Sequence, residues 1–150
     1  MVGGRGIRRV LSGLAAPLMA LVIGVAPALA MSQEEVNAML RNDERIRGDL
    51  IHAGIVAHIV EECDAFRGPS RLVRGAFFLS LRNHARRLGA SRAQIDAFVD
   101  DEAEQARLDT EVRRYIESTG AHPDNPASVC ALGRAEIAAG TRIGRRLRER

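Results

Sequence analysis

Two cysteines are the first residues in this chain from which a reactive site could be built. Cys63 and Cys130 are its only cysteines, and Cys130 falls in the first turn of a predicted helix, where a thiolate can be activated. Exported proteins with two cysteines more commonly form a disulfide between them, and the N-terminal leader described below predicts export. The sequence has no Cys-x-x-Cys motif, and a lone thiol is hard to keep reduced outside the cytoplasm. We therefore predict a disulfide between Cys63 and Cys130, with a reactive thiol as the alternative.

Histidine spacing supports metal binding only weakly. His58 and Glu62 are four residues apart, so both would lie on one face of a helix and could chelate a metal ion. His52 and His84 occur among apolar residues at helical spacing, which is typical of hydrogen-bonded histidines in a core. No motif like His-Glu-x-x-His is present. We predict no metal site and no cofactor.

Catalysis by a nucleophile needs a base beside that nucleophile, and the sequence contains no Gly-x-Ser-x-Gly motif. Glu136 is the one acid that falls beside an apolar stripe and so is predicted to be partly buried. Arg134 is only two residues away, on another side of the same helix, so the partner of Glu136 must come from elsewhere. We predict a structural role for Glu136 and no enzyme; a small helical envelope hydrolase is the alternative.

One set of residues favours binding instead of catalysis. In the helix predicted over residues 71–88, four arginines surround an aromatic ring on the side away from the core, and together they form the arginine face: Arg71, Arg74, Phe78, Arg82 and Arg86. Such a face suits an anionic partner or a lipid headgroup surface. The commoner outcome for such a face is that the following helix neutralises it within the fold, through its acids Asp96, Asp100, Asp101 and Glu104, and a binding surface is then the alternative. The basic tail at 142–150 could add a second contact with an anionic surface.

Helices must position these residues, and the sequence marks their ends. Ser70, a capping box of Ser91 with Gln94, and Asn125 followed by Pro126 are helix starts. We predict helices over residues 49–63, 71–88, 92–118 and 126–140, with a possible short fifth helix in the tail. The apolar side of the third helix changes midway, which predicts a bend near 106–110. In the second helix we expect these residues to face the core: Val73, Phe77, Ser80, His84 and Leu88. No alternating strand pattern occurs, so we predict an all-α bundle of four to five helices with one inter-helix disulfide.

The first thirty residues have the pattern of a signal peptide. Arginines precede an apolar run, and Ala-x-Ala stands at 28–30. We predict cleavage after Ala30 and export to the periplasm, with no stable membrane insertion afterwards; an uncleaved membrane anchor is the alternative. We further predict a polar, flexible lead-in over 31–48 and a single helical domain with one modest core over 49–150.

The charge of the chain is informative once this leader is set aside. The 22 basic residues are all arginines, they face 19 acidic residues, and the net charge is +3. Three of the arginines lie in the leader, so the remaining chain balances 19 arginines against 19 acids. The basic excess therefore belongs to the targeting signal and is no evidence for nucleic-acid binding.

Three quoted segments together resemble a known family. They are "ECDAF" at 62–66, "RAQIDAFVDDEAEQARL" at 92–108 and "DNPASVCALGRAEIAAGTRIGRRLR" at 124–148. Over most of residues 50–148 the chain is similar to small exported bacterial proteins described only as a domain of unknown function. The resemblance implies a conserved cysteine pair and implies no activity, substrate or catalytic residue. The polar segment at 31–48 departs from the family pattern.

The function that these observations favour is binding. We expect a non-enzymatic periplasmic helical protein that binds a protein or an anionic envelope partner through the arginine face. A second hypothesis is an acid-stress chaperone, because such proteins are also small, exported and helical with one disulfide. It would partly unfold and expose apolar surface near about pH 2–3.

Overall fold

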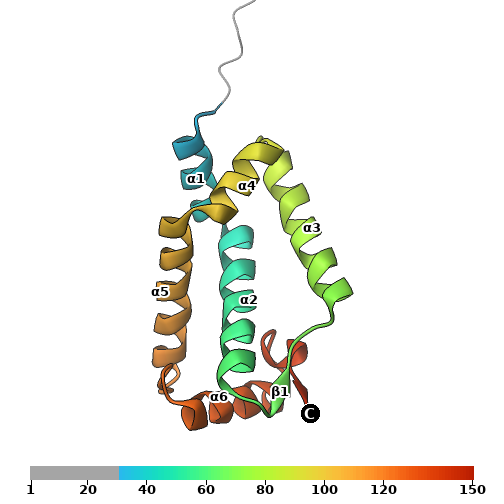
Figure 1. The fold of residues 1–150 in the computed structure, drawn as a ribbon, viewed down its shortest axis with the longest axis vertical. Helices are drawn as coiled ribbons and strands as arrows, with labels where there is room; N and C mark the ends of the chain where they lie inside the picture. Colours follow the sequence, from blue (N-terminus) through green and yellow to red (C-terminus); the bar gives the residue numbers. More distant parts are fainter. Residues whose placement is uncertain (1–30) are drawn as a thin grey trace, which may run out of the picture.

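The computed structural model describes residues 31–150, and the predicted signal peptide lies outside them. The described chain is mainly helical, as predicted, and its elements are α1 (Gln33–Asn42), α2 (Glu44–Glu62), β1 (Phe66–Arg67), α3 (Arg71–Arg87), α4 (Arg92–Asp100), α5 (Glu102–Ser118), α6 (Pro126–Ala138), the 3₁₀ helix η1 (Gly144–Arg146) and β2 (Arg148–Glu149). Figure 1 shows α2 at the centre, α5 beside it and α6 across their lower ends. On the other side of α2, α3 forms the edge of the molecule and diverges from it.

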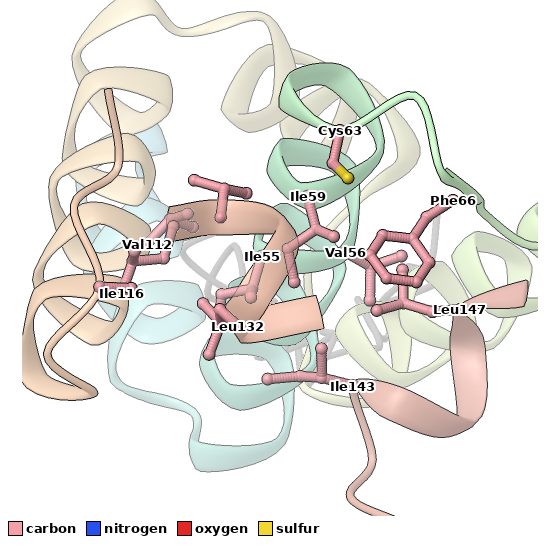
Figure 2. Packing of buried hydrophobic residues seen from close by; sticks show 12 residues of the cluster. Ile55, Val56, Ile59, Cys63, Phe66, Val112, Ile116, Leu132, Ile143 and Leu147 are labelled. Atoms are coloured by element: carbon pink, nitrogen blue, oxygen red, sulfur yellow. The ribbon is translucent and has the colours of Figure 1, made fainter. Parts of the chain in front are cut away.

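A disulfide joins the end of α2 to the first turns of α6. Cys63 and Cys130 form this bond with their Cα atoms 5.4 Å apart, which confirms the predicted pairing. Around it packs the larger of two apolar clusters, shown in Figure 2 and called here the stapled core: Ile55, Val56, Ile59, Cys63, Phe66, Val112, Ile116, Ala121, Val129, Leu132, Ile143 and Leu147. Its members come from both halves of the chain, so the core closes only when α2, α5, α6 and the C-terminal tail meet.

Two glycines allow backbones to approach closely around α6. A Cβ atom on Gly133 would lie 2.5 Å from the ring of Phe66 and 3.0 Å from Ile59. A Cβ atom on Gly144 would overlap the carbonyl group of Glu136. Gly133 of α6 therefore lets Phe66 pack directly against this helix, and Gly144 of η1 lets η1 do the same.

Residues 31–48 are helical, so the prediction of a flexible lead-in was wrong. Ser32 and Glu35 form a capping box that starts α1. Val36 and Leu40 of α1 are buried in the second apolar cluster, which also contains Ile46, Leu81, Ala85, Ala90 and Ile95. The mostly polar composition of the segment hid a narrow apolar stripe, and the molecule has two apolar clusters where one core was expected.

The predicted third helix is two helices. The chain breaks at Asp101, whose carboxylate accepts hydrogen bonds from the amides of Ala103 and Glu104 and so caps α5. The predicted bend near 106–110 lies after the observed break. The apolar residues that reveal the change of face occur only after the first turn of α5, so the sequence pattern places the bend too late. At its other end, α6 follows the prediction: Asn125 caps it and Pro126 begins it.

A short two-stranded ribbon was not predicted. Phe66 and Arg67 of β1 pair antiparallel with Glu149 and Arg148 of β2. Strands of two residues leave no alternation in the sequence, so only the fold reveals them. The ribbon holds the C-terminus beside β1, in the segment between α2 and α3 (Figure 1).

Candidate functional site

The helix α3 carries the predicted arginine face and buries little of its own surface. Only Leu81 and Ala85 among its 17 residues are buried. Val73 and Ser80 were predicted to face the core and are exposed instead, whereas Phe77 and His84 are half-buried. The prediction failed for Val73 because α3 diverges from α2 toward its N-terminus (Figure 1), whereas Phe77 still packs against the second apolar cluster.

Large apolar side chains of α3 point into solvent. Leu72 is 86% exposed, Leu79 is 59% exposed and Phe78 is 52% exposed. Exposed apolar side chains gathered on one element mark interaction surfaces more often than scattered ones do. The sequence pattern predicted that Phe78 is exposed and did not predict the exposure of the two leucines. A signal was available, because apolar residues occur all round this helix and a single buried stripe cannot hold them all.

The arginine face is only partly neutralised by the fold. Arg82 pairs with Asp96 at 2.8 Å. Of the other acids expected to neutralise the face, Asp101 caps α5 and Glu104 pairs with Arg41 at 3.2 Å. Within residues 31–150 no ion pair engages the remaining three arginines of the face: Arg71, Arg74 and Arg86.

The chain segment that contains the arginine face has no acidic residues. Residues 65–95 contain seven arginines and no aspartate or glutamate. The rest of the described chain, 31–64 and 96–150, holds the other 12 arginines and all 19 acids. The balanced charge of residues 31–150 therefore conceals a cationic segment and an acidic remainder, which net charge alone could not reveal.

The second half of α3 is fastened to the rest of the molecule by polar contacts. Arg45 of α2 donates a hydrogen bond to the Ser80 hydroxyl at 3.0 Å, and His84 Nε2 lies 3.1 Å from Asp43 Oδ2. Burial by itself would raise the pKa of Asp43, but hydrogen bonds from the Ile46 amide and from His84, with the charge of His84, bring the pKa below its usual value. These contacts fix the direction of α3 while its first half stays exposed.

The C-terminal tail touches the first half of α3 at one point. The guanidinium carbon of Arg146 lies 4.7 Å from the centroid of the Phe77 ring, a cation–π geometry. The rings of Phe77 and Phe78 meet edge to face with their centroids 5.2 Å apart. The basic tail therefore adds a further cation beside the arginine face.

Glu136 is buried in the structure and accepts hydrogen bonds from outside its own helix. It is 6% exposed, and its partners come from outside α6: Tyr115 donates a hydrogen bond to Oε1 at 3.1 Å and Thr141 donates one to Oε2. Burial, the hydrogen bond to Glu136 and its negative charge together raise the pKa of Tyr115. Glu136 also borders an open depression of about 410 Å³ between α6 and the segment 119–121 that follows α5. Both of its oxygens are engaged by the fold, so this depression lacks a free carboxylate base.

The histidines are not gathered into a site. His58 Nε2 lies 2.9 Å from the carbonyl oxygen of Pro123, and Glu62 is exposed, so the two do not converge on a common point. Among residues 31–150, no three His, Cys, Asp or Glu side chains are placed to hold a metal ion. Buried His52 Nδ1 has no hydrogen-bond partner in this part of the chain.

Comparison with known proteins gives one finding. The sequence model of DUF5333, a family of unknown function, matches residues 38–148. No curated protein and no solved structure matches the chain. The match covers everything from the end of α1 to β2, including both cysteines and the whole of α3.

Proposed function

The chain thus belongs to DUF5333, a family of unknown function, and we propose that it is a non-enzymatic periplasmic protein that binds an anionic partner of the cell envelope through α3. The observation that carries this proposal is the coincidence of charge and exposure on one helix. Five of the seven arginines in the acid-free segment 65–95 lie on α3, beside leucine and phenylalanine side chains that stand in solvent. A helix that merely completed the fold would bury those side chains and pair those charges.

Two features support placement in the periplasm. Residues 1–30 have the basic start, apolar run and Ala-x-Ala end of a cleavable signal. The bond between Cys63 and Cys130 is of the kind that persists in oxidising compartments. An exported protein meets anionic envelope components directly, which agrees with a cationic binding surface.

The arrangement of titratable groups favours binding over catalysis. The buried carboxylate of Glu136 is held by two hydroxyl groups, and His58 is directed to a backbone carbonyl. Catalysis needs a base and a nucleophile within reach of one reacting atom. The polar groups that a helical hydrolase would use are instead engaged in holding helices together.

Site-specific photo-cross-linking in producing cells tests this proposal. A photoreactive residue replaces Ala76, which is exposed on α3, or Ala131, which is exposed on α6. We expect adducts with envelope material from position 76 only, and we expect Arg71→Gln with Arg74→Gln to remove them. Equal adducts from both positions, or none from position 76, would show that α3 is not the binding surface.

An acid-stress chaperone remains a second candidate because α3 already exposes apolar side chains near neutral pH. It predicts that an apolar dye binds strongly at about pH 2–3, where a protein carries a net positive charge and its carboxylates are protonated. A cooperative native state with little dye binding at that pH would exclude the chaperone and leave the α3 binding proposal unaffected.

A further inference from the structure

We infer that the partner of α3 is the surface of an anionic phospholipid bilayer, on which the helix lies with its leucines inserted among the lipids. This inference rests on the proposed function and specifies its partner. Its grounds are the shape of the exposed helix, the arrangement of side chains along it and the distribution of charge over the molecule.

Apolar and cationic side chains lie next to each other along α3, as they do on helices that bind at a membrane interface. Leu72 and Leu79 are seven residues apart and so lie on the same side of the helix. Arg71, Phe78 and Arg82 follow each other at helical spacing beside them. Helices that lie in the interface insert leucine and phenylalanine to the depth of the headgroup–acyl boundary while their cations meet the lipid phosphates. The guanidinium group can bind a phosphate through two parallel hydrogen bonds.

The position of α3 in the fold suits a flat partner. The helix stands at the edge of the molecule (Figure 1), and its most exposed apolar residue, Leu72, projects almost entirely into solvent. A folded protein partner would need a groove shaped to that edge, whereas a fluid bilayer adapts to projecting side chains. No helix within residues 31–150 is long and apolar enough to cross a membrane.

Charge would orient the molecule on such a surface. The segment 65–95 is cationic, and the remainder, 31–64 with 96–150, carries 19 acids against 12 arginines. An anionic bilayer attracts the first and repels the second over about a Debye length, which is roughly 8 Å at physiological salt. Arg146, seated over Phe77, adds to the attracted side. The contacts of Arg45 with Ser80 and of His84 with Asp43 hold the helix at a fixed angle for this contact.

Vesicle binding tests the inference with the protein purified after export and its disulfide intact. The probes are vesicles of phosphatidylcholine alone and vesicles of phosphatidylcholine and phosphatidylglycerol in equal parts. We expect co-sedimentation with the anionic vesicles only, weakening as salt is raised. Arg71→Gln with Arg74→Gln should lower the partition coefficient about 25-fold, taking about fivefold per arginine. The matched pair Arg114→Gln with Arg134→Gln removes the same charge from α5 and α6 and should not weaken binding.

Insertion of the leucines can be measured separately by the fluorescence of an introduced tryptophan, because the chain contains no tryptophan of its own. The fluorescence of the Leu79→Trp variant should shift to the blue and be quenched by brominated lipid on anionic vesicles, while that of Ala131→Trp on α6 should do neither. Leu72→Asn with Leu79→Asn should lower partition about tenfold without any change of charge. Absent vesicle binding, equal losses in the two arginine pairs, or an unshifted emission from the Leu79→Trp variant would overturn the inference. If the vesicle tests fail in this way and position 76 still cross-links to a protein, α3 remains the proposed binding surface. Only the bilayer is then excluded as its partner.

Discussion

The stapled core and the first half of α3 meet within a few residues of the chain, yet they treat apolar side chains in opposite ways. Phe66 is 1% exposed and Leu72, six residues later, is 86% exposed. Phe66 packs against Gly133 and Ile59 beneath the disulfide, whereas Leu72 has left the core with the diverging helix. The residue type is apolar in both places, so the path of the backbone decides which side chain is buried.

This difference separates stability from binding in the molecule. The stapled core joins segments distant in the sequence through a disulfide and close backbone contacts. The first half of α3 is joined to the rest of the fold by its second half, where Ser80 and His84 are held, and by the contacts of Phe77. Substitutions in the stapled core should therefore lower the free energy of unfolding, and substitutions on exposed α3 should change binding alone.

Removal of the disulfide should have the largest effect. Cys63→Ala with Cys130→Ala opens a loop with a sequence separation of 67, and we expect the free energy of unfolding to fall by about 4 kcal/mol. Urea denaturation measures this loss. An unchanged midpoint would mean that the stapled core does not depend on its covalent link.

Two glycine-to-alanine substitutions compare the packed region around α6 with the exposed helix α3. Gly144→Ala places a methyl group against the Glu136 carbonyl, and we expect it to cost about 3 kcal/mol of stability. Gly75→Ala on α3 meets no atom within 4 Å and should gain up to about 1 kcal/mol from helix propensity. Thermal unfolding of the two variants should move in opposite directions, and a stabilised Gly144→Ala variant would contradict the structure.

Loss of the Tyr115 hydroxyl should have a moderate effect. Tyr115→Phe removes one of the two side-chain donors to the buried Glu136 carboxylate, and we expect a cost of about 1–2 kcal/mol. Chemical denaturation at neutral pH measures it. No change in stability would show that the Glu136 carboxylate does not depend on this donor.

The pH dependence of stability should depend on Asp43. Because its folded-state pKa lies below its unfolded value, ionised Asp43 stabilises the fold above the unfolded pKa, and this contribution disappears as pH falls through the folded pKa. Asp43→Asn keeps a good cap for α2 and loses the charge opposite His84. We expect it to be less stable by about 1 kcal/mol near neutral pH. The difference should vanish in acid; a constant difference across the range would assign the effect to capping.

The smallest effect on stability should come from the exposed leucines. Leu72→Asn with Leu79→Asn should change the free energy of unfolding by less than about 0.5 kcal/mol, although the same pair should lower partition onto anionic vesicles. Denaturation and vesicle sedimentation on one preparation compare the two properties. A large loss of stability would mean that α3 packs against the core more closely than its exposure indicates.

Local signals were sufficient to predict most helix ends. Asn125 with Pro126, Ser70, and Ser91 with Gln94 all cap helices where the sequence placed them. The break at Asp101 was missed because an aspartate inside a polar helix resembles any exposed residue until its carboxylate is seen to accept two backbone amides. The α1 helix was missed because its apolar stripe, Val36 and Leu40, is short and lies in a charged segment.

The sequence by itself determined the helical class, the pairing of Cys63 with Cys130 and the acid-free cationic segment at 65–95, because these follow from local propensity and composition. Only the tertiary structure decided that Leu72 and Leu79 are exposed, that Tyr115 and Thr141 are the partners of Glu136, and that most of the arginine face lies apart from the acids of α4 and α5. Burial and charge pairing are properties of distances between segments. Those distances depend on the angle at which each helix leaves the one before it.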